Sequence, residues 1–176
     1  MWDQPAPSDQ TAPSPLQDMA DHALRVSDIC DLLEAMADDL PRRPAPVWKE
    51  ARRMCDDVVR VHYTLLLDVL LPVLSTRLRG QPDCEHMLTR LNADFEEEAS
   101  KLTELTALMT DAVSDRARPI SPEALGYALR CFFCALRRNA MWETDVLLPL
   151  AKRALSADDL ESLTRLMRLD PVTGPS

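Results

Sequence analysis

Apolar residues recur along most of this chain at alternating spacings of three and four residues, which is the period of one face of an α-helix. In the first such stretch they include Val26, Ile29, Leu33 and Met36. The stretches with this pattern are residues 15–40, 47–78, 83–113, 122–155 and 157–169. The spacing therefore predicts four long amphipathic helices followed by a short C-terminal one.

Prolines and glycines lie where the apolar pattern stops, and short connections between long helices favour antiparallel neighbours. We therefore predict an all-α fold, an antiparallel up-down-up-down four-helix bundle with a short C-terminal helix, over residues 16–170. Residues 1–15 are rich in Pro, Ser, Gln and Asp and are predicted to form a disordered N-terminal tail. Residues 171–176 form a C-terminal tail.

The sequence Asp-Val-Leu-Leu-Pro occurs twice, at residues 68–72 and 145–149, an offset of 145 − 68 = 77. The same offset aligns two further pairs of positions, His62 with Asn139 and Leu66 with Glu143. Both copies keep the phase of the apolar face. The repeat predicts two helical hairpins related by a pseudo-two-fold axis.

Four polar residues, His22, His62, Asn139 and Glu143, interrupt the otherwise apolar faces. A polar side chain that is buried without a partner costs about 1–3 kcal/mol. We therefore expect these four to converge on one another, on water or on a metal ion. Glu98 is also expected to turn inward, unlike its acidic neighbours.

Three segments, in order, resemble the hemerythrin-like (HHE cation-binding) family, over about residues 18–167. Residues 21–25 (Asp-His-Ala-Leu-Arg) resemble its first helix. Residues 62–72 keep the spacing of its second-helix motif, in which His is followed four residues later by Glu and then by Leu-Phe-Pro, and 141–151 resemble its fourth helix. The resemblance implies two irons held by a histidine from each of four helices and bridged by carboxylates from the second and fourth.

The chain matches the ligand pattern that this resemblance implies at His22, His62 and Glu143. It departs from the pattern at three positions, Leu66, Phe95 and Asn139. An intact di-iron centre is therefore not expected. The remaining two imidazoles and one carboxylate suit one Fe(II), Zn(II) or Mn(II) ion, with Glu98 or Asn139 as an additional ligand. The alternative is a site without metal, in which His22 and Glu143 form a hydrogen-bonded pair in a dry core.

The formal net charge of −9 argues against nucleic acid as a partner, because phosphate binding needs clustered Lys and Arg. No apolar run approaches the roughly 20 residues that span a bilayer, and the N-terminal residues lack the basic start and apolar run of a secretory signal. The five cysteines are odd in number and lie within helical patterns. We therefore expect a cytoplasmic protein with reduced thiols and no membrane partner.

Three cysteines, Cys30, Cys55 and Cys131, lie seven or eight residues from His22, His62 and Asn139 along their helices. This spacing predicts one layer of thiols roughly 10–12 Å below the polar positions. Such thiols pack as small apolar residues or, in the alternative, form a thiolate metal site.

These patterns predict a binding or sensing module with at most a single metal ion and no assigned enzymatic activity. Two alternatives stay open. One is a metal-free helical adaptor, which binds a protein partner or a second copy through its acidic surface or C-terminal helix. The other is a mononuclear metalloenzyme, for which the sequence offers ligands but no evident acid–base partner.

Overall fold

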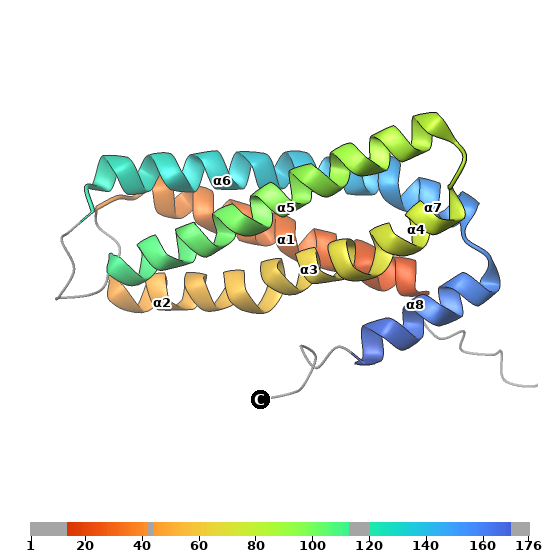
Figure 1. Cartoon of the computed structure of the whole chain (residues 1–176). Coiled ribbons are helices and arrows are strands. Elements are labelled where there is room, and N and C mark those ends of the chain that lie inside the picture. The colour runs from red at the N-terminus through yellow and green to blue at the C-terminus, as the bar shows by residue number, and fades with distance from the viewer. Residues whose placement is uncertain (1–13, 42–43, 113–119, 170–176) are drawn as a thin grey trace, which may run out of the picture.

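In the computed structural model the described residues, 14–41, 44–112 and 120–169, form helices and short turns, with no strand among them. The elements are α1 (Pro15–Asp38), α2 (Ala45–Met54), η1 (Cys55–Arg60), α3 (Val61–Thr64), η2 (Leu65–Leu70), α4 (Leu71–Arg77), α5 (Pro82–Asp111), α6 (Pro122–Trp142), η3 (Glu143–Leu147), α7 (Leu148–Ala154) and α8 (Ala157–Leu169). Elements α2 to α4 join end to end, as do α6 to α7, so the long helical stretches lie side by side with α8 across one end (Figure 1). The predicted all-α class is confirmed.

The observed helical stretches begin and end within two residues of the predicted bounds. The predicted disordered tail lies outside the described residues except for Ser14 and Pro15, which begin α1. Residues 171–176 also lie outside them.

Local chemistry explains where two of the helices begin. The Ser121 hydroxyl accepts a hydrogen bond from the backbone N–H of Ala124 at 3.1 Å and so caps α6. At α8 the Asp159 carboxylate accepts from the backbone N–H of Ser156 at 2.8 Å, while the Ser156 hydroxyl accepts from the N–H of Asp159 at 3.3 Å. This reciprocal pair is a capping box, which defines the start of the C-terminal helix.

The two copies of Asp-Val-Leu-Leu-Pro adopt the same local structure. Each contains the end of a π-helical segment, η2 or η3, which stops two residues before the proline. Proline has no N–H to donate to the carbonyl four residues earlier, so the wider π-helical turn is accommodated just before it. A seven-residue α-helix follows each copy, α4 at Leu71–Arg77 and α7 at Leu148–Ala154. Since 71 + 77 = 148 and 77 + 77 = 154, the backbone repeats at the offset of the sequence.

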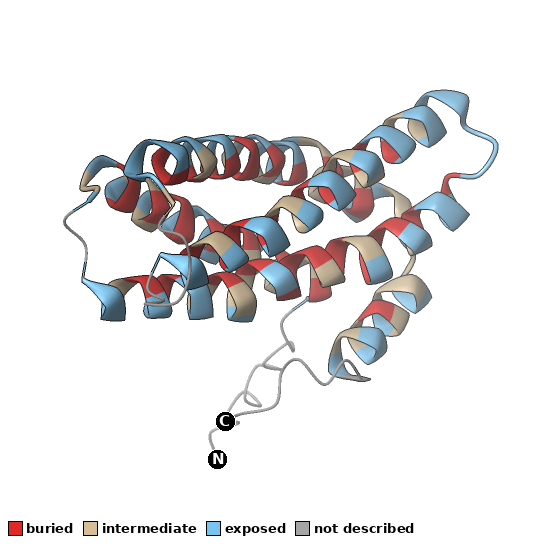
Figure 2. Cartoon of the chain, turned by 60° about the vertical axis from the view of Figure 1, so that its left-hand side comes forward, coloured by how far each residue is buried: buried red, intermediate tan, exposed pale blue. Residues whose placement is uncertain are grey.

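Buried residues form stripes along the long helices that face the interior (Figure 2). Two of them occupy positions where the resemblance would require metal ligands. Leu66 is 1% exposed and Phe95 is 0% exposed. Both side chains therefore serve as apolar core.

The predicted layer of three thiols is wrong. Cys30 and Cys55 are buried, but Cys131 is exposed. In α6 the inward positions at this level are taken by Phe132 and Phe133, which are buried. Eight residues turn a helix by about 80° beyond two full turns, so Cys131 keeps the predicted depth relative to Asn139 but turns outward.

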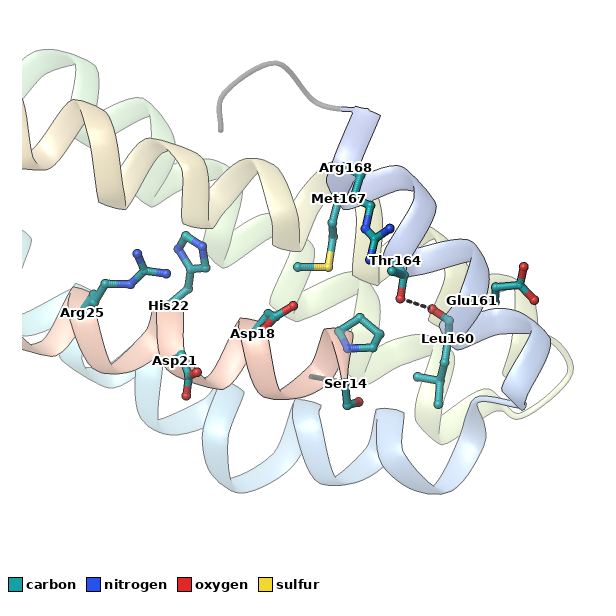
Figure 3. Close-up of a pocket in the computed structure, with 11 residues that line it drawn as sticks. Ser14, Asp18, Asp21, His22, Arg25, Leu160, Glu161, Thr164, Met167 and Arg168 are labelled. Carbon is teal, nitrogen blue, oxygen red and sulfur yellow. Dashed lines mark hydrogen bonds between the residues drawn. The ribbon is translucent and has the colours of Figure 1, made fainter. Parts of the chain in front are cut away.

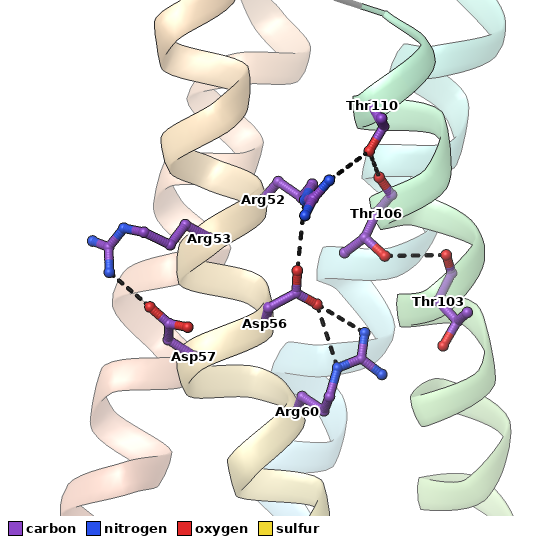
Figure 4. Close-up of polar contacts among 8 residues, drawn as sticks. All are labelled: Arg52, Arg53, Asp56, Asp57, Arg60, Thr103, Thr106 and Thr110. Carbon is purple, nitrogen blue, oxygen red and sulfur yellow. Dashed lines mark hydrogen bonds and ion pairs between the residues drawn. The ribbon is translucent and has the colours of Figure 1, made fainter. Parts of the chain in front are cut away.

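A polar network on the surface joins the second helical stretch to α5 (Figure 4). Arg52 donates a hydrogen bond to the Thr110 hydroxyl at 3.1 Å. Asp56 lies between two guanidinium groups, 3.6 Å from Arg52 and 2.8 Å from Arg60. Because these groups are solvent-accessible, each pair stabilises the fold by no more than about 1 kcal/mol.

One helical stretch, Ala45–Arg77, is long and apolar enough by length and composition to cross a membrane. However, 56% of its most apolar window is buried inside the protein. The core helix of a water-soluble protein meets the same criterion, so the finding is weak evidence for a membrane span.

Candidate functional site

The interior contains polar side chains as well as apolar ones. Among the described residues the buried polar and charged ones are His62, Glu98, Thr106, Asn139 and Glu143. His62 belongs to α3, Glu98 to α5, Asn139 to α6 and Glu143 to η3. Three helical stretches thus contribute to one interior polar cluster, which we define as His62, Tyr63, Glu98, Asn139 and Glu143.

His62 and Glu143 are in direct contact. The Nε2 atom of His62 lies 2.8 Å from Oε2 of Glu143, and their residues are 4% and 0% exposed. Even so, no hydrogen bond of normal geometry reaches either carboxylate oxygen from the described residues. The predicted metal-free pair of His22 with Glu143 is wrong about the partner, because His62 takes that place.

Tyr63 belongs to this cluster although the sequence analysis did not single it out. Burial raises the pKa of the Tyr63 phenol far above its usual range, an effect that Asn139 opposes and that the Glu98 and Glu143 carboxylates increase. The Tyr63 ring also packs against Phe95, with centroids 6.2 Å apart. Tyr63 lies beside the polar face of its helix rather than on it. Helical periodicity therefore could not predict that Tyr63 joins the cluster.

Several buried side-chain atoms in this part of the described chain have no hydrogen-bond partner. They are His22 Nδ1, Tyr63 Oη, Glu98 Oε2, Asn139 Nδ2 and both carboxylate oxygens of Glu143. The other oxygen of Glu98 accepts from Lys101 Nζ at 2.8 Å. Burying polar atoms unpaired is unfavourable by about 1–3 kcal/mol each, so the cluster favours any ligand that can satisfy several at once.

His22 lies at the edge of the cluster rather than inside it. It lines a pocket of about 630 Å³ between the start of α1 and α8, where its ring points inward from α1 (Figure 3). Burial lowers the pKa of His22 to about 4, with Arg25 and then His62 adding to the effect. The ring is therefore neutral at pH 7 and able to accept a hydrogen bond or to ligate.

The structure brings together two of the three residues predicted as metal ligands. His62 and Glu143 are in contact. His22 lies near enough to His62 for His62 to help lower the pKa of His22. However, within the described ranges no three His, Cys, Asp or Glu side chains are grouped closely enough to hold a metal ion. A two-iron centre does not fit these residues, because buried Leu66 and Phe95 fill positions that its ligands would need.

No protein-family model and no curated protein matches this chain. The hemerythrin-like resemblance thus rests on the three segments and their spacing alone.

Proposed function

We propose that this protein is a hemerythrin-like binding or sensing module whose ligand site is the interior polar cluster, and that the site takes one divalent metal ion, Fe(II) or else Zn(II) or Mn(II). The proposal includes an antiparallel up-down-up-down bundle. It assigns no catalytic reaction to the protein.

This proposal rests on the burial of the Glu143 carboxylate without well-oriented hydrogen-bond donors among the described residues. The carboxylate is fully buried, Oε2 lies 2.8 Å from His62 Nε2, and among the described residues neither oxygen accepts a well-oriented hydrogen bond. A buried carboxylate is strongly destabilising unless a cation or several donors compensate it. A metal ion bound to imidazole and carboxylate would supply that compensation.

The course of the chain supports the bundle topology. In Figure 1 the ribbon of α1 and of α5 runs one way, while that of α2 to α4 and of α6 to α7 runs the other. The links between consecutive stretches are short, which favours antiparallel neighbours. Of the helix pairs, α1 packs against α6 and α5 packs against α6.

Two residues would anchor the metal ion, His62 through Nε2 and Glu143 through its carboxylate. Neutral oxygens of Tyr63 and Asn139 lie in the same cluster, and His22 stands at its edge. A metal held by so few protein ligands would keep open positions for a small ligand such as dioxygen or nitric oxide. His22 would then control access, since it lines the pocket beside α8 and lies close to His62.

Metal analysis of protein purified without a metal-affinity tag tests this proposal. After anaerobic reconstitution with Fe(II), we expect about one equivalent of bound metal. The His62→Ala variant should lose most of it, and His86→Ala, which removes an exposed histidine of α5, should keep it. Less than about a tenth of an equivalent in the wild-type protein would contradict the proposal.

A specific observation also favours a second candidate, the metal-free adaptor. Met141 is 63% exposed and Trp142 is 47% exposed, next to each other at the end of α6. Together with Arg138 they line a hollow of about 320 Å³. Exposed Trp and Met are frequent at protein interfaces, so this end of α6 is where a protein partner would bind if the interior site proves to hold no metal.

A further inference from the structure

Two free cysteines lie one helical turn apart on the outside of α6. Cys131 and Cys134 are both exposed, whereas Cys30 and Cys55 are buried. Free cysteine is among the most buried residue types in proteins, so two neighbouring exposed thiols are unusual. Residues three apart lie on the same helix face, which lets both sulfur atoms reach one ligand.

Both thiols open into one groove between α5 and α6, of about 780 Å³. Lys101 and Arg138 line the same groove. Lys101 is paired with Glu97 and Glu98, and Arg138 lies near enough to Glu97 to help lower the pKa of that carboxyl. An otherwise acidic protein thus places two cationic side chains, Lys101 and Arg138, beside its two exposed thiols.

The geometry discriminates between the chemistries open to such a thiol pair. Side chains three apart on a helix have Cβ atoms about 5–6 Å apart, whereas a disulfide needs about 3.5–4.5 Å, so oxidation would distort α6. A tetrahedral ion such as Zn(II) needs four ligands, and the described residues contain no group of three His, Cys, Asp or Glu side chains that could hold a metal ion. A two-coordinate ion between the sulfur atoms meets neither obstacle.

We propose that Cys131 and Cys134 form a two-coordinate site for a soft monovalent cation, Cu(I). Thiolates are soft ligands that select Cu(I). Binding replaces two S–H bonds by two S–Cu bonds and releases two protons, so the complex has a net charge of −1. Arg138, with Lys101 nearby, stabilises that charge. This site is separate from the interior polar cluster.

The test is an anaerobic titration of the reduced full-length protein with Cu(I) held by a coloured competing chelator. We expect the wild-type protein to remove about one equivalent from the chelator and to develop ultraviolet thiolate-to-copper absorption. Cys131→Ser and Cys134→Ser should each abolish both signals. Cys84→Ser, which changes the partly buried thiol of α5, is the matched control and should behave as wild type.

Two results would overturn the proposal. One is that the wild-type protein takes no copper from the chelator. Another is that the Cys131→Ser/Cys134→Ser double variant, with an unchanged circular dichroism spectrum, takes as much as wild type. If no copper is bound, mass spectrometry after alkylation shows whether air oxidation instead joins these two cysteines in a disulfide.

Discussion

The two repeated segments share a backbone and differ in chemistry. Each has a π-helical segment, a proline two residues later and a seven-residue α-helix, at an offset of 77 residues. Just upstream of the shared five residues, however, the two copies differ. The first has His62 and Leu66 where the second has Asn139 and Glu143. The imidazole of one copy meets the carboxylate of the other at 2.8 Å.

This difference shows that backbone shape and site chemistry are specified separately. The proline makes the local helix geometry alike in both copies, whatever precedes it. The ligand type depends on single residues upstream. As a result each copy supplies one side chain of the contact between His62 and Glu143, and neither copy forms a complete site of its own.

The largest effect should follow from replacing Leu66 of the first copy by glutamate, the residue that the second copy has at the equivalent position. Leu66 is buried, so Leu66→Glu places a second carboxylate in the core, and we expect the free energy of unfolding to fall by at least about 4 kcal/mol. Urea denaturation at pH 7 measures it. Leu66→Gln, which has the same shape without the charge, should cost about 2 kcal/mol. Equal losses for the two variants would mean that charge is not the cause.

An intermediate effect should follow from removing one or both side chains of the contact between His62 of the first copy and Glu143 of the second. His62→Leu leaves the Glu143 carboxylate buried without its partner, so we expect a loss of about 3 kcal/mol, again by urea denaturation. The His62→Leu/Glu143→Leu double variant should be more stable than either single variant, because no charge remains unpaired. If the losses of the two single variants simply add, the contact is not an energetic unit.

The smallest effect concerns the ends of the two copies, where Arg77 in the first corresponds to Ala154 in the second. Hydrogen bonds from the Ser156 backbone and side chain, and then from Arg77, lower the pKa of Asp159 from 3.8 to about 2. Because the folded-state pKa is the lower one, this stabilisation is present above about pH 4 and is lost as the pH falls toward 2.

We therefore expect Asp159→Asn to flatten the decrease in melting temperature between about pH 5 and pH 2, and Arg77→Ala to flatten it partly. Thermal unfolding followed by circular dichroism measures this dependence. Asp158→Asn, in the same helical turn, is the control and should leave the profile unchanged. A profile that is the same in all three variants would contradict the assignment.

The sequence by itself determined the helices and the local repeat. The spacing of Val26, Ile29, Leu33 and Met36 placed α1, because an apolar face at this period is stable only as a buried helix. The two prolines dictated equivalent backbone in both copies, because a missing N–H acts locally. Helical phase also predicted that His62, Asn139 and Glu143 would be interior.

Only the tertiary structure decided which of these side chains meet. Periodicity gives the angle of a residue about its own helix axis, but not the tilt and rotation of neighbouring helices. That relative placement puts the Glu143 carboxylate against His62 instead of His22, and it brings Tyr63 into the cluster. The partner of a buried charge depends on atoms from distant segments, and these come together only when the helices pack.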